Sequence, residues 1–298
     1  MPELPEVEVL VRHLSPLLKN KTVRGLDVRR AKVLAPTTVT QLKSAVIGAR
    51  FSGLARRGKY LVFELQQRSR RGSVFLLGHL GMTGRVYLAR RGDPLPKHAA
   101  VVIDLGRQTL IFEDTRYFGR LTLDMTPLAK LGPEPLSPKF TPAYLAAKLK
   151  RSSQAIKVKL LDQSLVAGIG NIYASEALFR AGISPRLVAR GLRPEQVRRL
   201  WRAIRQVLRE AIRCGSTVPL SFSRRGKRDG LFYFGRAPNT SDYYAERLQV
   251  YGREGEACQV CGTRIRRAIQ ASRSTFYCPR CQRGPASRMR RKCRGKTS

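Results

Sequence analysis

The segment Leu131-Gly-Pro-Glu-Pro-Leu-Ser-Pro138 separates two parts of the chain that have different hydrophobic periodicity. Its three prolines within eight residues prevent it from continuing a helix or a central strand. We therefore predict a linker over residues 131–140. It follows an N-terminal domain over residues 1–130 and precedes a second domain over residues 141–248.

The part before the linker starts with apolar residues at helical spacing, which predicts a helix over residues 3–18. From about Thr22 to Met125 the pattern changes to short strand-like runs between clusters of Gly, Arg and Pro. These runs cover residues 60–65, 74–80, 99–105, 109–112 and 119–123. Such runs are typical of an antiparallel sandwich or barrel. We therefore predict an α+β protein whose first domain is an antiparallel β-sandwich preceded by one helix.

The part after the linker is mostly helical. An apolar stripe from Val197 to Ile212 predicts an amphipathic helix, with Pro194 in its first turn and Gly215 at its C-terminal cap. Residues 217–248 show no clear period and predict a long loop within this domain. Residues 284–298 are basic and poor in apolar side chains, so we predict a disordered tail there.

Composition points to a polyanionic partner. The chain has 298 residues, with 58 Lys and Arg against 20 Asp and Glu, and a formal charge of +38. Because 42% of the residues are hydrophobic, a wholly disordered polycation is excluded. A charge this large opposes compaction unless a polyanion shares the surface, which makes nucleic acid the leading partner. No apolar run is long enough for a membrane span and the N-terminus lacks a signal-peptide pattern, so we expect a cytosolic chain.

Four of the six cysteines form two close pairs near the C-terminus. Cys258-x-x-Cys261 and Cys278-x-x-Cys281 are separated by sixteen residues, a spacing typical of four-cysteine zinc sites. Four thiolates close the coordination shell, so we predict one structural Zn2+ and a zinc finger over residues 249–283. Two disulfides or four free thiols are the alternative. Several arginines between the pairs predict a cationic edge suited to phosphate, or simply a solvated face.

The chain begins Met1-Pro2-Glu3, which makes Pro2 a candidate nucleophile. Removal of the initiator methionine would expose a secondary amine, and an α-amine titrates near pH 8, so part of it is unprotonated at neutral pH. Such an amine can add to a sugar C1′ and form a cationic iminium ion. Glu3 is adjacent and can transfer protons. The alternative is an ordinary chain start in which acidic residues favour a helix N-terminus.

Several motifs, in the same order along the chain, resemble those of the formamidopyrimidine-DNA glycosylase family. They are MPELPEVE at 1–8, RGKY at 57–60, HLGMTG at 79–84, DTRYFG at 114–119, LLDQSLVAGIGNIYASE at 160–176, VYGREGEAC at 250–258 and RSTFYCPRCQ at 273–282. The resemblance extends from residue 1 to about residue 283. It implies an N-terminal β-sandwich, a helix, two-turns, helix domain and a zinc finger, with DNA bound in the cleft between the domains.

The resemblance also implies the catalytic roles. Pro2 would form the Schiff base, Glu3 would be a proton donor, Lys59 would donate a proton in β-elimination, and Arg273 would do so in δ-elimination. Arg56 and Arg57 flank Lys59 in the sequence, and neighbouring cations lower the pKa of a lysine. A simple phosphate contact by Lys59 is the alternative.

Asn171 belongs to the segment Gly168-Ile-Gly-Asn171, which directly precedes an apolar run. From the residues alone we expect Asn171 to cap a helix, with backbone amides forming a phosphate cradle at the helix start. By resemblance, this is the DNA-binding turn, and Asn171 would contact phosphates on both sides of the lesion.

Met82, Arg116 and Phe118 match the three family residues that fill the space left by an extruded nucleotide. Apolar side chains can replace a base in the stack, and an arginine can donate hydrogen bonds to the unpaired cytosine. The alternative is that Met82 and Phe118 are core residues. His98 and Arg116 match DNA-contact positions, whereas the third such position, a lysine in close relatives, is Ser152 here and is preceded by Arg151.

Residues 217–248 depart from the family, in which a shorter segment closes over the flipped base. The segment carries a basic run at 224–228 and the aromatic run Phe232-Tyr-Phe234. These aromatics can stack on a base or pack the loop against the protein.

The resemblance implies a base-excision-repair enzyme that removes oxidised purines and cleaves the strand by β,δ-elimination. Its expected partner is double-stranded DNA containing oxidised bases or abasic sites, and we expect a monomer in the bacterial cytoplasm, associated with the nucleoid. Two alternatives remain. One is an enzyme like endonuclease VIII that prefers oxidised pyrimidines, and the other is a zinc-finger DNA-binding protein without catalysis.

Overall fold

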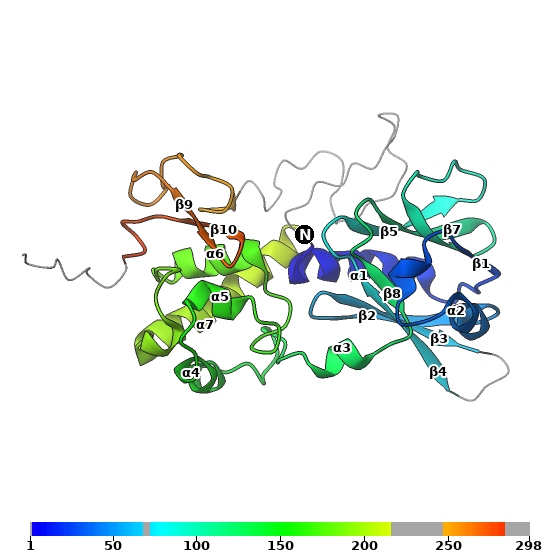
Figure 1. The fold of residues 1–298 in the computed structure, drawn as a ribbon, viewed down its shortest axis with the longest axis horizontal. Helices are drawn as coiled ribbons and strands as arrows, with labels where there is room; N and C mark the ends of the chain where they lie inside the picture. Colours follow the sequence, from blue (N-terminus) through cyan, green and yellow to red (C-terminus); the bar gives the residue numbers. More distant parts are fainter. Residues whose placement is uncertain (1, 68–71, 216–246, 284–298) are drawn as a thin grey trace, which may run out of the picture.

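The computed structural model describes residues 2–67, 72–215 and 247–283 (Figure 1). The predicted N-terminal helix is confirmed as α1 (Leu4–Leu18), with Pro5 in its first turn. Its start is secured by the Glu3 amide, which donates to the Glu6 carboxylate at 2.7 Å. Helix α1 therefore begins directly after the two residues that carry the expected chemistry.

Two four-stranded antiparallel sheets follow α1. The first sheet has the order β1 (Gly25–Val28), β6 (Ala99–Asp104), β7 (Gln108–Asp114) and β5 (Gly84–Arg90). The second has the order β2 (Arg50–Arg57), β3 (Tyr60–Gln66), β4 (Ser73–His79) and β8 (Arg120–Thr122). Apolar side chains from both sheets and from α1, among them Leu10, Phe63 and Ile103, share one buried core. The predicted β-sandwich is thus confirmed.

The five predicted strand-like runs coincide with β3, β4, β6, β7 and β8. Three further strands, β1, β2 and β5, and the helix α2 (Val39–Val46) were not singled out in the sequence. A register shift between Phe51 and Gly53 interrupts the alternation of β2, and β1 has only four residues. A short one-turn helix, η1 (Ala31–Leu34), connects β1 to α2.

The second half is built from helices. They are α3 (Thr126–Ala129), α4 (Pro142–Lys150), α5 (Ile156–Leu160), α6 (Asn171–Arg180), the short η2 (Ala189–Gly191) and α7 (Pro194–Arg213). Helix α7 matches the predicted amphipathic helix, and Gly215 follows it with φ of 83°, the left-handed conformation expected of a C-terminal glycine. Leu4 of α1 is buried in this helical core, while Leu10 belongs to the sandwich core. Helix α1 thereby joins the two halves.

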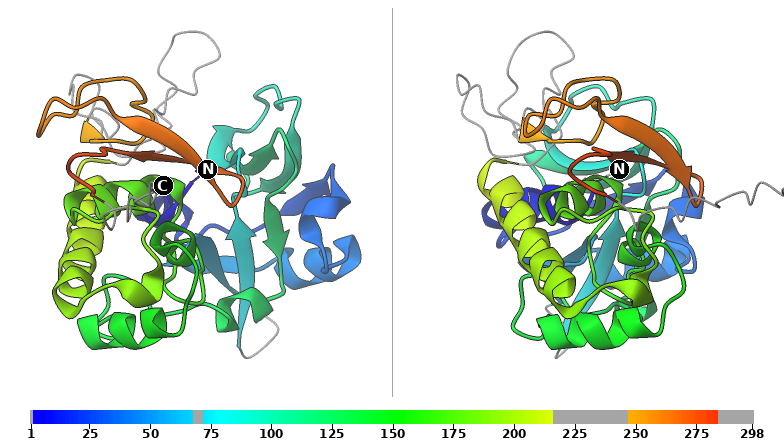
Figure 2. Two further views of the ribbon diagram at one scale, coloured as in Figure 1. Left: turned by 60° about the vertical axis from the view of Figure 1, so that its left-hand side comes forward. Right: turned by 90° about the vertical axis from the view of Figure 1, so that its left-hand side faces the viewer.

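A two-stranded hairpin, β9 (Arg266–Gln270) and β10 (Arg273–Tyr277), completes the described chain. Strand β10 lies against α6, and the tip of the hairpin is directed toward the sandwich (Figure 2). Among the described residues, no helix is both long enough and apolar enough to cross a bilayer. The predicted loop over 217–248, with its basic and aromatic runs, lies outside the described residues apart from 247 and 248, as does the predicted tail over 284–298.

Candidate active site

Glu3 connects the two halves through a buried carboxylate. It is 1% exposed and accepts hydrogen bonds from the backbone amides of Gly170 (2.8 Å), Ile172 (2.9 Å) and Tyr173 (3.3 Å). These are the first amides of α6, which have no partner within the helix. Glu3 therefore caps a helix that lies nearly 170 residues away in the sequence, and its carboxyl oxygens lie at the positive end of the helix dipole.

This contact corrects the expectation that Asn171 caps α6. The N-cap position is Gly170, Asn171 is the first helical residue, and no side chain of either residue caps the helix. The expected backbone cradle for phosphate is also wrong at this point, because Glu3 already occupies the amides. A carboxylate from another domain accepts three amides at once, which a neighbouring amide side chain cannot do.

Burial raises the pKa of Glu3, an effect that the nearby Lys59 opposes and Glu6 reinforces. A raised pKa keeps a larger protonated fraction near neutral pH, as a general acid requires. Pro2, partly exposed, immediately precedes Glu3. The capped carboxylate therefore holds the start of the described chain at the junction of the two halves.

Lys59 lies in the turn between β2 and β3 and is only 8% exposed. Its pKa is lowered, first by burial and then by the positive charge of Arg273, while Glu3 acts in the opposite direction. The predicted direction of the Lys59 pKa shift is correct, but its cause is different. Arg56 and Arg57 are neutralised by ion pairs with Glu134 at 2.7 Å and 3.1 Å. The fold thus places Lys59 within electrostatic reach of both Glu3 and Arg273.

Arg273 begins β10 directly after the hairpin tip and is exposed. The tip residues Ala271 and Ser272 have φ of 46° and 58°, as the first and second positions of a tight two-residue turn require. Non-glycine residues in this region carry backbone strain, which often accompanies functional positions. The arginines expected to form a cationic edge, Arg264, Arg266 and Arg267, are exposed on the same finger.

Asn171 takes part in a buried network around Lys157, a residue that the sequence analysis missed. The Lys157 ammonium donates to Asn171 Oδ1 (2.7 Å), to Ser274 O (2.9 Å) and to Thr275 Oγ1 (2.9 Å). Asn171 Nδ2 also donates to Ser274 O at 3.0 Å. Lys157 is 1% exposed, and its pKa is lowered to about 8, mainly by burial. The only signal in the sequence was a lysine directly after the apolar Ile156, which is too weak to identify it.

Met82, Arg116 and Phe118 lie together on two neighbouring loops. Arg116 Nη1 lies 3.3 Å from Met82 Sδ, and its guanidinium lies 4.9 Å from the centre of the Phe118 ring. Met82 is 45% exposed and Phe118 is 55% exposed, so the alternative that these two are core residues is wrong. Exposed apolar side chains beside an arginine fit an insertion into stacked bases.

The other DNA-contact candidates, His98 and the pair Arg151 and Ser152, differ in their exposure. His98 is partly exposed, and its Nδ1 lies 3.2 Å from the hydroxyl of Tyr117, between Arg116 and Phe118. Ser152 is 7% exposed, and its hydroxyl accepts from the amide of Gln154, while the adjacent Arg151 is exposed. Of these two residues, only Arg151 is therefore accessible to phosphate.

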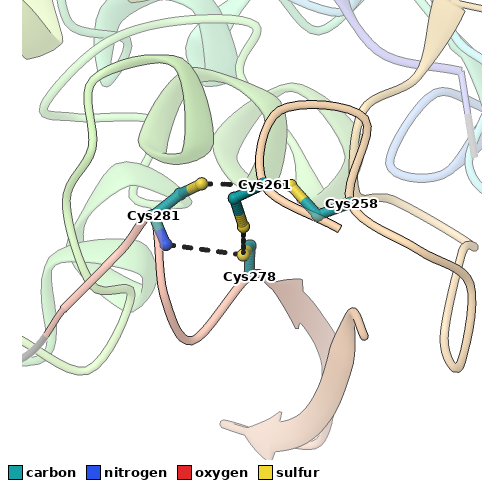
Figure 3. Close-up of side chains that lie close together, drawn as sticks. All are labelled: Cys258, Cys261, Cys278 and Cys281. Carbon is teal, nitrogen blue, oxygen red and sulfur yellow. Dashed lines mark hydrogen bonds between the residues drawn. The ribbon is translucent and has the colours of Figure 1, made fainter. Parts of the chain in front are cut away.

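The four cysteines of the two pairs converge on one point (Figure 3). Their sulfur atoms all lie within 4.8 Å of one another, with Cys258 to Cys281 at 3.9 Å and Cys261 to Cys278 at 3.5 Å. Sulfurs at the corners of a zinc tetrahedron with Zn–S bonds of about 2.3 Å are separated by about 3.8 Å. All four are free thiols, so the disulfide alternative is wrong and the donor set fits one zinc ion.

Comparison with known proteins identifies relatives along nearly the whole chain. Family models match for the formamidopyrimidine-DNA glycosylase N-terminal domain (residues 1–121), its H2TH domain (residues 131–221) and a zinc finger found in FPG and IleRS (residues 255–284). A formamidopyrimidine-DNA glycosylase of Carboxydothermus hydrogenoformans is 39% identical over 95% of this chain and 100% of its own length. One from Symbiobacterium thermophilum is 44% identical over 96% of this chain and 90% of its own length.

Solved structures agree with these relatives. A Lactococcus lactis Fpg bound to DNA with an abasic site has a TM-score of 0.83 and 31% identity, covering 95% of this chain and 100% of its own. The same protein bound to DNA containing Fapy-dG has a TM-score of 0.83 and 32% identity, with the same coverage.

Proposed function

Because the chain belongs to the formamidopyrimidine-DNA glycosylase family, we propose that Pro2 is the nucleophile through which it excises damaged bases from DNA. The protein is a base-excision-repair DNA glycosylase with AP lyase activity and one structural zinc ion. Relatives of solved structure are bound to DNA with Fapy-dG, an 8-oxoguanine analogue or an abasic site. Double-stranded DNA with oxidised purines or abasic sites is accordingly the proposed substrate.

The observation that supports this function best is the capping of α6 by Glu3. Glu3, the neighbour of Pro2, interacts electrostatically with Lys59, which also interacts with Arg273, and this supports a shared site for residues from different parts of the chain. Once Met1 is removed, the Pro2 nitrogen attacks C1′ of the damaged nucleotide, and the glycosidic bond breaks as the base leaves with the bonding electrons. The nitrogen then loses its proton, the C1′–O4′ bond breaks as O4′ gains a proton, and the product is an iminium ion between Pro2 and the opened sugar.

The acids around Pro2 account for the proton transfers. Glu3, with its raised pKa, donates a proton as the sugar ring opens. In β-elimination, C2′ loses a proton and the C3′ phosphate leaves with a proton from Lys59. In δ-elimination, C4′ loses a proton and the C5′ phosphate leaves with a proton from Arg273. The lowered pKa of Lys59 brings its proton transfer closer to neutral pH.

Binding is assigned to the residues around this centre. Asn171, His98 and Arg116 would contact phosphate or base edges, while Met82 and Phe118 fill the vacated stack. The zinc ion, held by Cys258, Cys261, Cys278 and Cys281, stabilises the finger that carries Arg273 and takes no part in the chemical steps. We propose that the protein acts as a monomer. The named relatives are bacterial, which supports a bacterial cytoplasmic enzyme, and we propose that it acts on chromosomal DNA at the nucleoid.

Borohydride trapping tests the proposed nucleophile. Purified protein of intact mass lacking Met1 is incubated with duplexes that contain 8-oxoguanine opposite cytosine, an oxidised pyrimidine or an abasic site. We expect covalent adducts with the purine lesion and the abasic site. With the purine lesion, the adduct should be strongly reduced in Glu3→Gln and weakened in Pro2→Gly, whose N-terminal glycine still offers a primary amine that can form a Schiff base. An adduct only with pyrimidine and abasic lesions would favour the endonuclease VIII-like alternative. Absence of any adduct would leave a DNA-binding protein without catalysis.

A further inference from the structure

Asp114 is a buried carboxylate at the end of β7 to which the chemistry above assigns no role. It is 0% exposed, although it lies two residues before Arg116. A buried carboxylate is costly unless several donors satisfy it, so the groups that bind it indicate what it organises.

The side chain of Asp114 joins the two loops that carry the apolar wedge. Its Oδ1 accepts from the hydroxyl of Thr83 at 2.5 Å and from the amide of Arg116 at 3.1 Å. Its Oδ2 accepts from the amide of Gly119 at 2.7 Å. Thr83 follows Met82 directly, while Arg116 and Gly119 bracket the segment that contains Phe118. One carboxylate thus binds both ends of the second loop and the neighbour of Met82.

The main chain of Asp114 reaches a third DNA-contact candidate. Its amide donates to the carbonyl of His98 at 3.1 Å, so Asp114 also fixes the backbone of His98. The His98 ring in turn contacts Tyr117, whose φ of 54° is in the left-handed region. The second loop therefore has a strained turn that depends on fixed neighbours.

Close backbone packing makes the arrangement sensitive to small displacements. A Cβ on Gly81 would lie 2.7 Å from the amide nitrogen of Gly119, so the two loops are in direct main-chain contact. Met82 and Phe118 themselves are largely exposed and have little core packing to position them. Their geometry before DNA binds therefore depends on the hydrogen bonds beneath them and on the contacts of Arg116 with both side chains.

We propose that Asp114 is a positioning residue that preorganises Met82, Arg116 and Phe118 for insertion into the DNA stack. The proposal rests on the wedge role given to these three residues under the proposed function. Because the abasic sugar of a single strand needs no base to be extruded, Asp114 affects base excision from duplex DNA and leaves the chemistry at Pro2 unchanged.

Asp114→Asn tests the proposal with a minimal change of shape. An amide has one acceptor oxygen, so its NH2 group faces either the Gly119 amide or the Thr83 and Arg116 donors, and at least one loop is released. We expect excision of 8-oxoguanine from duplex DNA to fall about 10- to 100-fold, since small misplacements cost this much. Cleavage of a single-stranded abasic oligonucleotide should stay within about twofold of the wild-type protein.

A direct measure of insertion accompanies the rates. 2-Aminopurine placed beside a tetrahydrofuran site fluoresces when it is unstacked, so wild-type protein should increase the signal, and Asp114→Asn should give a smaller increase at saturating protein. Asp104→Asn is the matched control, because Asp104 accepts from the Gly106 amide in a turn of the same sheet at the far end of β6. It should behave as the wild-type protein does.

Thr83 variants test the positioning role of Asp114 if Asp114→Asn does not fold. Thr83→Val removes one donor to Asp114 and should reduce duplex excision and the fluorescence increase selectively, whereas Thr83→Ser keeps the hydroxyl and should restore both. Equal losses on duplex and single-stranded substrates, or no loss on either, would overturn the positioning role of Asp114. The proposed function would still stand in that case, provided that wild-type protein forms the borohydride-trapped adduct. Absence of a wild-type adduct would overturn the proposed function instead.

Discussion

Glu3 and Lys59 carry charge with at most 8% of their surface exposed, whereas Met82 and Phe118 are apolar and about half exposed. The first pair lies at the junction of the two halves and is held by the α6 amides and the β2–β3 turn. The second pair lies on loops above a buried carboxylate. Proton transfer benefits from desolvated groups with shifted pKa values, while insertion into DNA needs apolar surface that is free beforehand. The two regions therefore invert the usual rule for burial, as the roles proposed for them require.

Among the variants that test this contrast, Gly170→Ala is expected to have the largest effect. A Cβ at Gly170 would overlap the Glu3 carboxylate, so the cap at α6 must shift. We expect a loss of stability of about 1–3 kcal/mol, as for other overpacked sites, and about a hundredfold loss of excision through displacement of Pro2. Thermal unfolding and single-turnover kinetics measure the two effects. Gly191→Ala, where a Cβ meets open space, is the control and should change neither. Wild-type excision by Gly170→Ala would show that the cap does not position the nucleophile.

Phe118→Ala should separate function from stability in the second region. Because Phe118 is 55% exposed, its removal should change the free energy of unfolding by less than about 0.5 kcal/mol. Excision from duplex DNA should fall about tenfold, within the range of one aromatic stacking contact. The control is Phe75→Ala, an equally simple change at a 42% exposed phenylalanine of β4. Equal effects of the two variants on excision would contradict the wedge.

The last prediction concerns the pH dependence of stability and involves no change in excision. The pKa of Lys157 is lowered from 10.5 to about 8, so between these values the unfolded chain binds more protons than the folded protein. Stability contributed by this group therefore rises with pH from about 8 to about 10.5, by less than about 1.4 kcal/mol per pH unit. Denaturant unfolding of wild-type protein and Lys157→Met at several pH values measures it.

The difference between the two unfolding free energies should increase in favour of the wild-type protein across that range. Lys150→Met, at an exposed lysine of α4, should show no such trend. A flat difference for Lys157→Met would mean that the ammonium is not destabilised by burial.

The hydrophobic pattern of the sequence predicted the helices and strands that bury one face along a single segment. The stripe that became α7 and the alternation that became β3 both reflect burial of one face, which is visible within ten or twenty residues. Strand β2 escaped prediction because its bulge and its arginines disrupt that alternation. The exposure of Met82 and Phe118 was also beyond the sequence, since an apolar side chain is more often buried.

The zinc ligands follow from the sequence by itself, because cysteine spacing acts over a few residues. Proline geometry is equally local, and it predicts the division at residues 131–138. Only the tertiary structure decided that Glu3, and not Asn171, caps α6, that Lys157 binds the zinc-finger strand, and that Asp114 joins the two loops. Glu3 and Lys157 bond to partners more than 100 residues away. A single buried charge gains its hydrogen bonds only after separate elements have packed, and no local pattern records which donors will meet it.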